Sequence, residues 1–73
     1  MNEQELAEAF GLKVRERRKR TGTTQKELAE EIGVTRVYMG LIERGDTSIT
    51  LAKVYKLAAA LNCDVSDLLP PVK

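Results

Sequence analysis

Apolar residues recur every three or four positions along this 73-residue chain, and that spacing predicts helices rather than strands. The first predicted helix covers residues 3–21 and ends at Gly22. Its apolar stripe consists of Leu6, Phe10 and Val14. Two shorter helices follow. Thr24 and Glu27 form a capping box at the start of one, and Gly45 ends the other.

The C-terminal part of the chain continues the same pattern. Thr50 caps a fourth predicted helix, whose apolar face consists of Leu51, Val54, Leu57, Ala58 and Leu61. A short fifth helix, capped by Asp64 or Ser66, ends at two prolines and contributes Val65, Leu68 and Leu69. The pattern therefore predicts an all-α fold of five helices around one small core, in a single domain over residues 1–73.

Residues 25–44 meet the position-specific requirements of a helix-turn-helix. Counted from Gln25, the fifth position must be small because the second helix crosses there, and the ninth favours glycine for the turn. These positions hold Ala29 and Gly33. The fourth, eighth, tenth, fifteenth and eighteenth positions need apolar residues, and they hold Leu28, Ile32, Val34, Met39 and Ile42. The alternative, an ordinary amphipathic helical hairpin, would match all seven positions less often.

The charge is unevenly distributed, although the net charge is only +1. Residues 1–9 carry three glutamates and no base, whereas residues 13–26 carry seven bases and one glutamate. A local positive field on a nearly neutral protein suits binding to a polyanion. The alternative is an ordinary solvated helix face.

Composition argues against several functional classes. No apolar run approaches the roughly 20 residues of a membrane span, and the acidic first nine residues do not form a signal peptide. We therefore expect a cytoplasmic protein. There is no histidine, and Cys63 is the only cysteine, which we expect to be a buried or half-buried apolar residue. We expect no metal site, cofactor or small-molecule substrate, and no enzyme activity, because the chain lacks a nucleophile–base pair.

On these features the chain resembles the lambda-repressor-like, Xre-type helix-turn-helix family over nearly its full length. The matching segments are FGLKVRERRK, TQKELAEEIGV, the ERG that ends the third helix, and ITLAKVYKLAAALNCDVSDLL. RVYMGLIERG and SITL are similar to the controller proteins of restriction–modification systems. The resemblance implies a five-helix DNA-binding domain that regulates transcription and places its third helix in the major groove.

The resemblance also implies which residues contact DNA. Base contacts are expected from Thr35, Arg36, Val37, Gly40 and Leu41. Arg36 could bridge O6 and N7 of a guanine or bind a phosphate instead, and Val37 could touch a thymine methyl or be exposed packing. Gly40 could leave room for DNA or a partner, or have no function, and Leu41 would read few hydrogen-bond patterns. Phosphate contacts are expected from Thr24, Gln25, Lys26 and the hydroxyl of Tyr38.

A structural ion pair and a dimer are further implications of the resemblance. Arg18 is expected to pair with Glu43 and hold the first helix against the third, whereas Arg17 would protrude. A homodimer would bind pseudo-palindromic double-stranded DNA through two successive major grooves. Its interface candidates are Tyr55, Val65, Leu69 and Val72, although Val65 and Leu69 could instead close the monomer core. The alternative function is an antitoxin-like protein-interaction module that also binds its own promoter.

Overall fold

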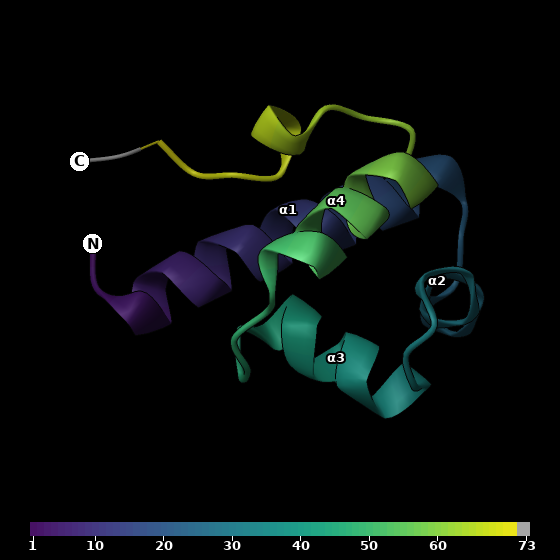
Figure 1. Ribbon diagram of the computed structural model, residues 1–73, viewed down its shortest axis with the longest axis horizontal. Coiled ribbons are helices and arrows are strands. Elements are labelled where there is room, and N and C mark those ends of the chain that lie inside the picture. The colour runs from purple at the N-terminus through teal and green to yellow at the C-terminus, as the bar shows by residue number, and fades with distance from the viewer. Residues whose placement is uncertain (72–73) are drawn as a thin grey trace.

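The computed structural model describes residues 1–71, which form four α-helices and one turn of 3₁₀ helix (Figure 1). The elements are α1 Glu3–Thr21, α2 Gln25–Ile32, α3 Arg36–Arg44, α4 Leu51–Ala60 and η1 Val65–Asp67. The predicted all-α fold is confirmed. The expected fifth helix is only the single 3₁₀ turn, because Pro70 and Pro71 follow closely and lack the N–H groups that would extend it. No helix within residues 1–71 is both long and apolar enough to cross a lipid bilayer.

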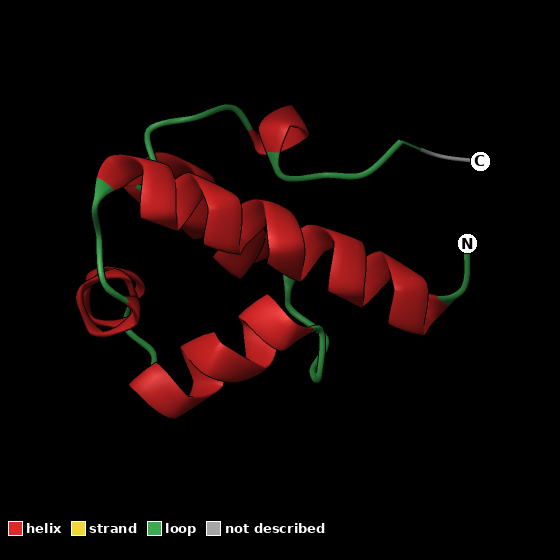
Figure 2. Ribbon diagram, turned by 180° about the vertical axis from the view of Figure 1, so that it is seen from behind, coloured by secondary structure: helices red, strands yellow, loops and turns green. Residues whose placement is uncertain are grey.

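The helices enclose one core. α1 packs against α3, α2 packs against both α3 and α4, and η1 packs against α4. In Figure 1, α2 is seen nearly end-on while α1 and α3 run across the view, so α2 crosses both steeply. Figure 2 shows the same arrangement from behind, with the N-terminus and the C-terminal segment at one end of the molecule.

The core contains most of the apolar positions that the sequence pattern selected. Its buried members are Phe10, Val14, Leu28, Ala29, Ile32, Met39, Ile42, Val54, Leu57, Ala58, Leu61 and Leu68. Two predicted members are wrong, since Leu6 is 47% exposed and Leu51 is 70% exposed. Both lie in the first turns of their helices, and Leu6 lines a hollow beside the core residues Phe10, Ile42 and Val54 without being enclosed by them.

α1 and α3 approach so closely that only glycine fits at position 11. A Cβ at Gly11 would lie 2.6 Å from the carbonyl oxygen of Glu43 and closer still to that of Ile42. Both obstacles are backbone atoms, which cannot rotate away as a side chain can. Gly11 therefore lets α3 rest directly on the backbone of α1, and this contact fixes the position of α3.

Side-chain caps set where the helices begin. Thr24, Thr35 and Thr50 each accept a hydrogen bond from a backbone N–H in the first turn of α2, α3 and α4, as the sequence predicts. α1 begins with a capping box that the sequence analysis missed. There the Asn2 side chain accepts from the Glu5 N–H at 2.8 Å, and the Glu5 carboxylate accepts from the Asn2 N–H at 3.0 Å.

Candidate nucleic-acid interface

The N-terminus of α2 forms one edge of the candidate interface. The Thr24 hydroxyl accepts the Glu27 N–H at 3.1 Å, and the Glu27 carboxylate accepts the Thr24 N–H at 2.9 Å. The pKa of the Glu27 carboxyl lies below its ordinary value. The main cause is the hydrogen bond from the Thr24 backbone N–H, and the second is hydrogen bonding with the Thr24 side chain. Thr24 and Lys26 are exposed at this helix end, where backbone N–H groups and the helix dipole favour an anion.

Gly33 forms the turn between α2 and α3 and so sets the direction of α3. Its φ of 78° lies in the left-handed region, which glycine adopts at little cost. The N–H of the next residue, Val34, donates to the Ala29 carbonyl at 2.9 Å and closes the end of α2. Thr35 then starts α3 by accepting the Tyr38 N–H at 3.0 Å. The helix-turn-helix over residues 25–44 is thus present with its predicted caps and turn.

Three of the expected base-contacting residues are open to solvent on the outer face of α3. Thr35 and Arg36 are exposed, and Val37 is 67% exposed. Leu41, on the same face, is half-buried. Side chains from the first turn of α3 are therefore available to a ligand that lies along this helix.

Gly40 lies on the same outer face, yet it is buried. A Cβ at this position would lie 3.2 Å from Nη1 of Arg44 and 4.0 Å from Oε1 of Gln25. These two side chains cover the glycine. Gly40 stays a predicted part of the DNA-facing surface, and in the unbound protein these two side chains lie over it.

A chain of polar contacts connects α1 to Arg36. Arg18 donates from Nε to Oε2 of Glu43 at 2.6 Å and from Nη2 to Oε1 at 3.1 Å. Gln25 donates from Nε2 to the same Oε1 at 3.1 Å, and its own Oε1 accepts from Nη1 of Arg36 at 3.1 Å. The Glu43 side chain is only 2% exposed. The ion pair expected between Arg18 and Glu43 is present, and one amide links it to the exposed arginine of α3.

Two of the expected phosphate contacts are already engaged. The Tyr38 hydroxyl donates to the Ser48 carbonyl at 3.2 Å, and its ring packs against the core. A phosphate has no proton to donate, so this hydroxyl could bind one only by giving up its bond to Ser48. Tyr38 stays a predicted phosphate contact, and in the unbound protein its hydroxyl donates to Ser48. Gln25 uses one amide hydrogen for Glu43 and keeps a second, so it still has a donor for a phosphate.

Arg44 belongs to the outer face of α3, although it is not among the residues predicted to contact DNA. It follows Arg36 by eight residues, which is about two helical turns, and lies on the same side of the helix. Its side chain is 62% exposed, and its Nε donates to Oδ2 of Asp46 at 3.1 Å. The signal in the sequence was the spacing of Arg36, Gly40 and Arg44 at intervals of four.

The basic run of α1 supplies less free charge than its composition suggests. Arg17 pairs with Asp67 of η1 at 3.5 Å rather than protruding freely, and Arg18 pairs with Glu43. Arg15, Lys19 and Arg20 are exposed. Within the helix-turn-helix unit itself, the basic residues are Lys26, Arg36 and Arg44.

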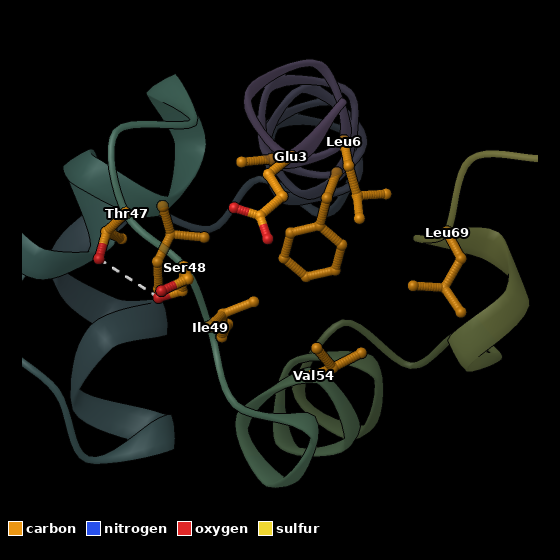
Figure 3. Close-up of a pocket in the computed structure, with 10 residues that line it drawn as sticks. Glu3, Leu6, Thr47, Ser48, Ile49, Val54 and Leu69 are labelled. Carbon is orange, nitrogen blue, oxygen red and sulfur yellow. Dashed lines mark hydrogen bonds between the residues drawn. The ribbon is translucent and has the colours of Figure 1, made fainter. Parts of the chain in front are cut away.

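The residues expected at a dimer interface lie in different settings. Tyr55 is 58% exposed on α4, and Leu69 is 44% exposed in the C-terminal segment. Val65 is half-buried against the core, and Val72 lies outside the described residues. A hollow of about 430 Å³ is lined by Leu6 of α1 and by Leu69 of the C-terminal segment, which come to it from opposite ends of the chain (Figure 3).

Comparison with known proteins adds to this geometry. The family whose model matches the chain is described as helix-turn-helix, and the match covers residues 14–68. Control protein C.SmaI of Serratia marcescens is 37% identical over 65 residues, which cover 89% of this chain and 77% of that protein. The regulator SutR of Escherichia coli is 33% identical over 66 residues, but the chain spans only 37% of its length.

Solved structures give the same result for the fold. The restriction–modification controller protein C.AhdI from Aeromonas hydrophila matches with a TM-score of 0.83 at 36% identity. The match covers 86% of this chain and 96% of that one. The DNA-binding domain of BldD matches with a TM-score of 0.83 at 30% identity, and covers 96% of this chain.

Proposed function

The chain belongs to the helix-turn-helix family of DNA-binding transcription regulators, and we propose that it binds a pseudo-palindromic operator as a homodimer with α3 in the major groove. The observation that carries this proposal is the position of Arg36. It is exposed at the first turn of α3, and the amide of Gln25 holds it against the N-terminus of α2.

Arg36 is the proposed base-reading residue. A guanidinium has five N–H donors, and the bond to Gln25 uses one of them. The remaining donors suffice for a paired contact with O6 and N7 of a guanine, which is worth roughly 1–3 kcal/mol of discrimination. Thr35 and Val37 flank it on the exposed surface, where the Val37 side chain can contact a thymine methyl.

The start of α2 is the proposed phosphate-binding edge. Thr24 and Lys26 are exposed there, and Gln25 retains one amide hydrogen. A phosphate at this point would accept from free backbone N–H groups and lie at the positive end of the helix dipole. Such contacts would set the position of the protein on DNA without reading its sequence.

The homodimer would use the apolar residues left exposed on α4 and in the C-terminal segment. Leu51 and Tyr55 lie one turn apart on α4, at 70% and 58% exposure, and Leu69 is 44% exposed. A two-fold arrangement would place two copies of α3 about 34–36 Å apart, in successive turns of the major groove. The similarity to C.SmaI and C.AhdI supports a controller role, in which protein concentration sets the expression of a promoter.

Selection of bound duplexes from random DNA would test the function directly. We expect a pseudo-palindromic site, and affinity that falls steeply between low and physiological salt. Arg36→Ala should lose base preference at one position in each half-site. Arg15→Ala removes the same charge from α1, outside the helix-turn-helix unit, and should retain that preference. Failure to select any site, together with copurification of a protein encoded nearby, would instead favour the antitoxin-like module.

Sedimentation measurements would test the homodimer separately. We expect a dimer at micromolar concentration, weakened by Tyr55→Glu because this change places a charge in the proposed apolar interface. A protein that stays monomeric at high micromolar concentration, both free and on DNA, would contradict the proposed dimer.

A further inference from the structure

The fold itself does not require glycine at position 40. Glycine inside a helix costs about 1 kcal/mol relative to alanine, and a close backbone contact explains that choice at Gly11. At Gly40 the nearest groups to an added Cβ are side-chain atoms, Nη1 and Cζ of Arg44 and Oε1 of Gln25, at 3.2 to 4.0 Å. An alanine at position 40 would therefore displace two polar side chains on the proposed DNA-binding surface, those of Arg44 and Gln25.

Helix geometry explains why Arg44 crosses this glycine. Side chains in an α-helix point toward its N-terminus, so the side chain of Arg44 extends over the residue four positions earlier, which is Gly40. The bond from Nε to Asp46 holds one edge of the guanidinium at 3.1 Å. Nη1 of Arg44 lies over Gly40, 3.2 Å from the place of an added Cβ, on the same outer face as Arg36.

We propose that Arg44 is a second DNA-contacting residue of α3. Gly40 is then a positioning residue, because the lack of a Cβ leaves room for the Arg44 guanidinium above it. This inference rests on the proposed DNA binding. The Nη edge of Arg44 would donate to oxygen or nitrogen acceptors of DNA, on either a guanine edge or a phosphate. Asp46 fixes the guanidinium plane through Nε and leaves that edge free, because guanidinium has four further N–H groups.

A double-mutant cycle in DNA affinity tests this coupling. The probes are the operator selected with the wild-type protein and a random-sequence duplex of equal length. Arg44→Ala should weaken operator binding roughly 5- to 150-fold for each half-site, the range expected for losing one paired arginine contact. Gly40→Ala should weaken binding several-fold in the wild-type protein, because the new methyl group displaces the guanidinium. In the Arg44→Ala background the same change should alter affinity less than twofold.

The random duplex identifies the acceptor. If Arg44 reads a guanine, Arg44→Ala should weaken operator binding only, whereas loss of a phosphate contact should weaken both duplexes alike. Thermal melting of Gly40→Ala should show a fold at least as stable as wild type, so that its lost affinity reports the position of Arg44.

Two results would overturn the inference. One is unchanged operator affinity in Arg44→Ala. The other is an equal loss from Gly40→Ala in both backgrounds, which would mean that the methyl group meets DNA directly. A wild-type protein that binds neither duplex would be a different result, since it would overturn the proposed function itself.

Discussion

Replacing Gly11 by alanine tests how α3 is held in place. In most helix positions this change stabilises a protein, because alanine is favoured over glycine by about 1 kcal/mol. At Gly11 the added Cβ would lie 2.6 Å from the Glu43 carbonyl oxygen, and closer to that of Ile42. Optimal contact is about 3.5 Å. α1 and α3 must therefore separate by about 1 Å, which also strains the Arg18–Glu43 pair that joins them.

The expected size follows from these opposing effects. Overpacking a well-packed site costs about 1–3 kcal/mol and occasionally more. The upper end applies here because backbone atoms oppose the methyl group. After subtracting the helix-propensity gain of about 1 kcal/mol, we expect Gly11→Ala to lower the free energy of unfolding by about 2 kcal/mol. For a domain of this size that corresponds to a decrease in Tm of about 8–16 °C.

Urea denaturation followed by circular dichroism at 222 nm would measure this change. Gly40→Ala is the matched control, since it makes the same substitution in a helix where only flexible side chains are displaced. It should leave the free energy of unfolding unchanged or raise it by up to about 1 kcal/mol. Equal stability of Gly11→Ala and Gly40→Ala would refute the proposed close packing of α1 on α3.

Three further predictions concern the ion pair, the first cap of the unit and the cysteine. Glu43→Ala should lower the free energy of unfolding by about 3–5 kcal/mol in urea titrations, because it leaves Arg18 unpaired at 12% side-chain exposure. The lowered pKa of Glu27 stabilises the fold above the ordinary glutamate pKa of about 4.3, and this contribution is lost as pH falls through the lowered value. Urea midpoints should therefore fall less on acidification in Glu27→Gln than in wild type. Burial raises the pKa of the Cys63 thiol, so Ellman's reagent at neutral pH should react more slowly with folded than with urea-unfolded protein.

Local signals in the sequence predicted most of the fold. Thr24, Thr35 and Thr50 start helices where the capping pattern indicated, and Gly33 takes the expected left-handed turn. These features depend on residues a few positions apart, so they can be read from the chain alone. Gly11 could not be recognised in this way. Its role depends on a backbone approach between α1 and α3, which are separated by about 30 residues in the sequence.

The candidate site was less predictable for the same physical reason. Whether a polar side chain is free depends on which partner lies within hydrogen-bond distance, and the partners of Tyr38 and Gln25 come from other elements. Gly40 was placed on the correct face, but the sequence pattern did not show that Arg44 covers it. Periodicity therefore identified the outer face of α3. Only the three-dimensional contacts show which side chains on that face are free to bind a ligand.

Arg36 on the outer face of α3 is the residue proposed to read a DNA sequence. The most direct measurement compares the affinity of wild type and Arg36→Ala for the selected operator and for a random duplex, over a range of salt concentrations. We predict a loss of roughly 1–3 kcal/mol for each half-site, and so roughly 2–6 kcal/mol for the dimer, on the operator only, with a nearly unchanged dependence on salt. An equal loss on both duplexes, with the salt slope reduced by about 1 for each subunit, would show that Arg36 binds a phosphate and would contradict base reading by Arg36.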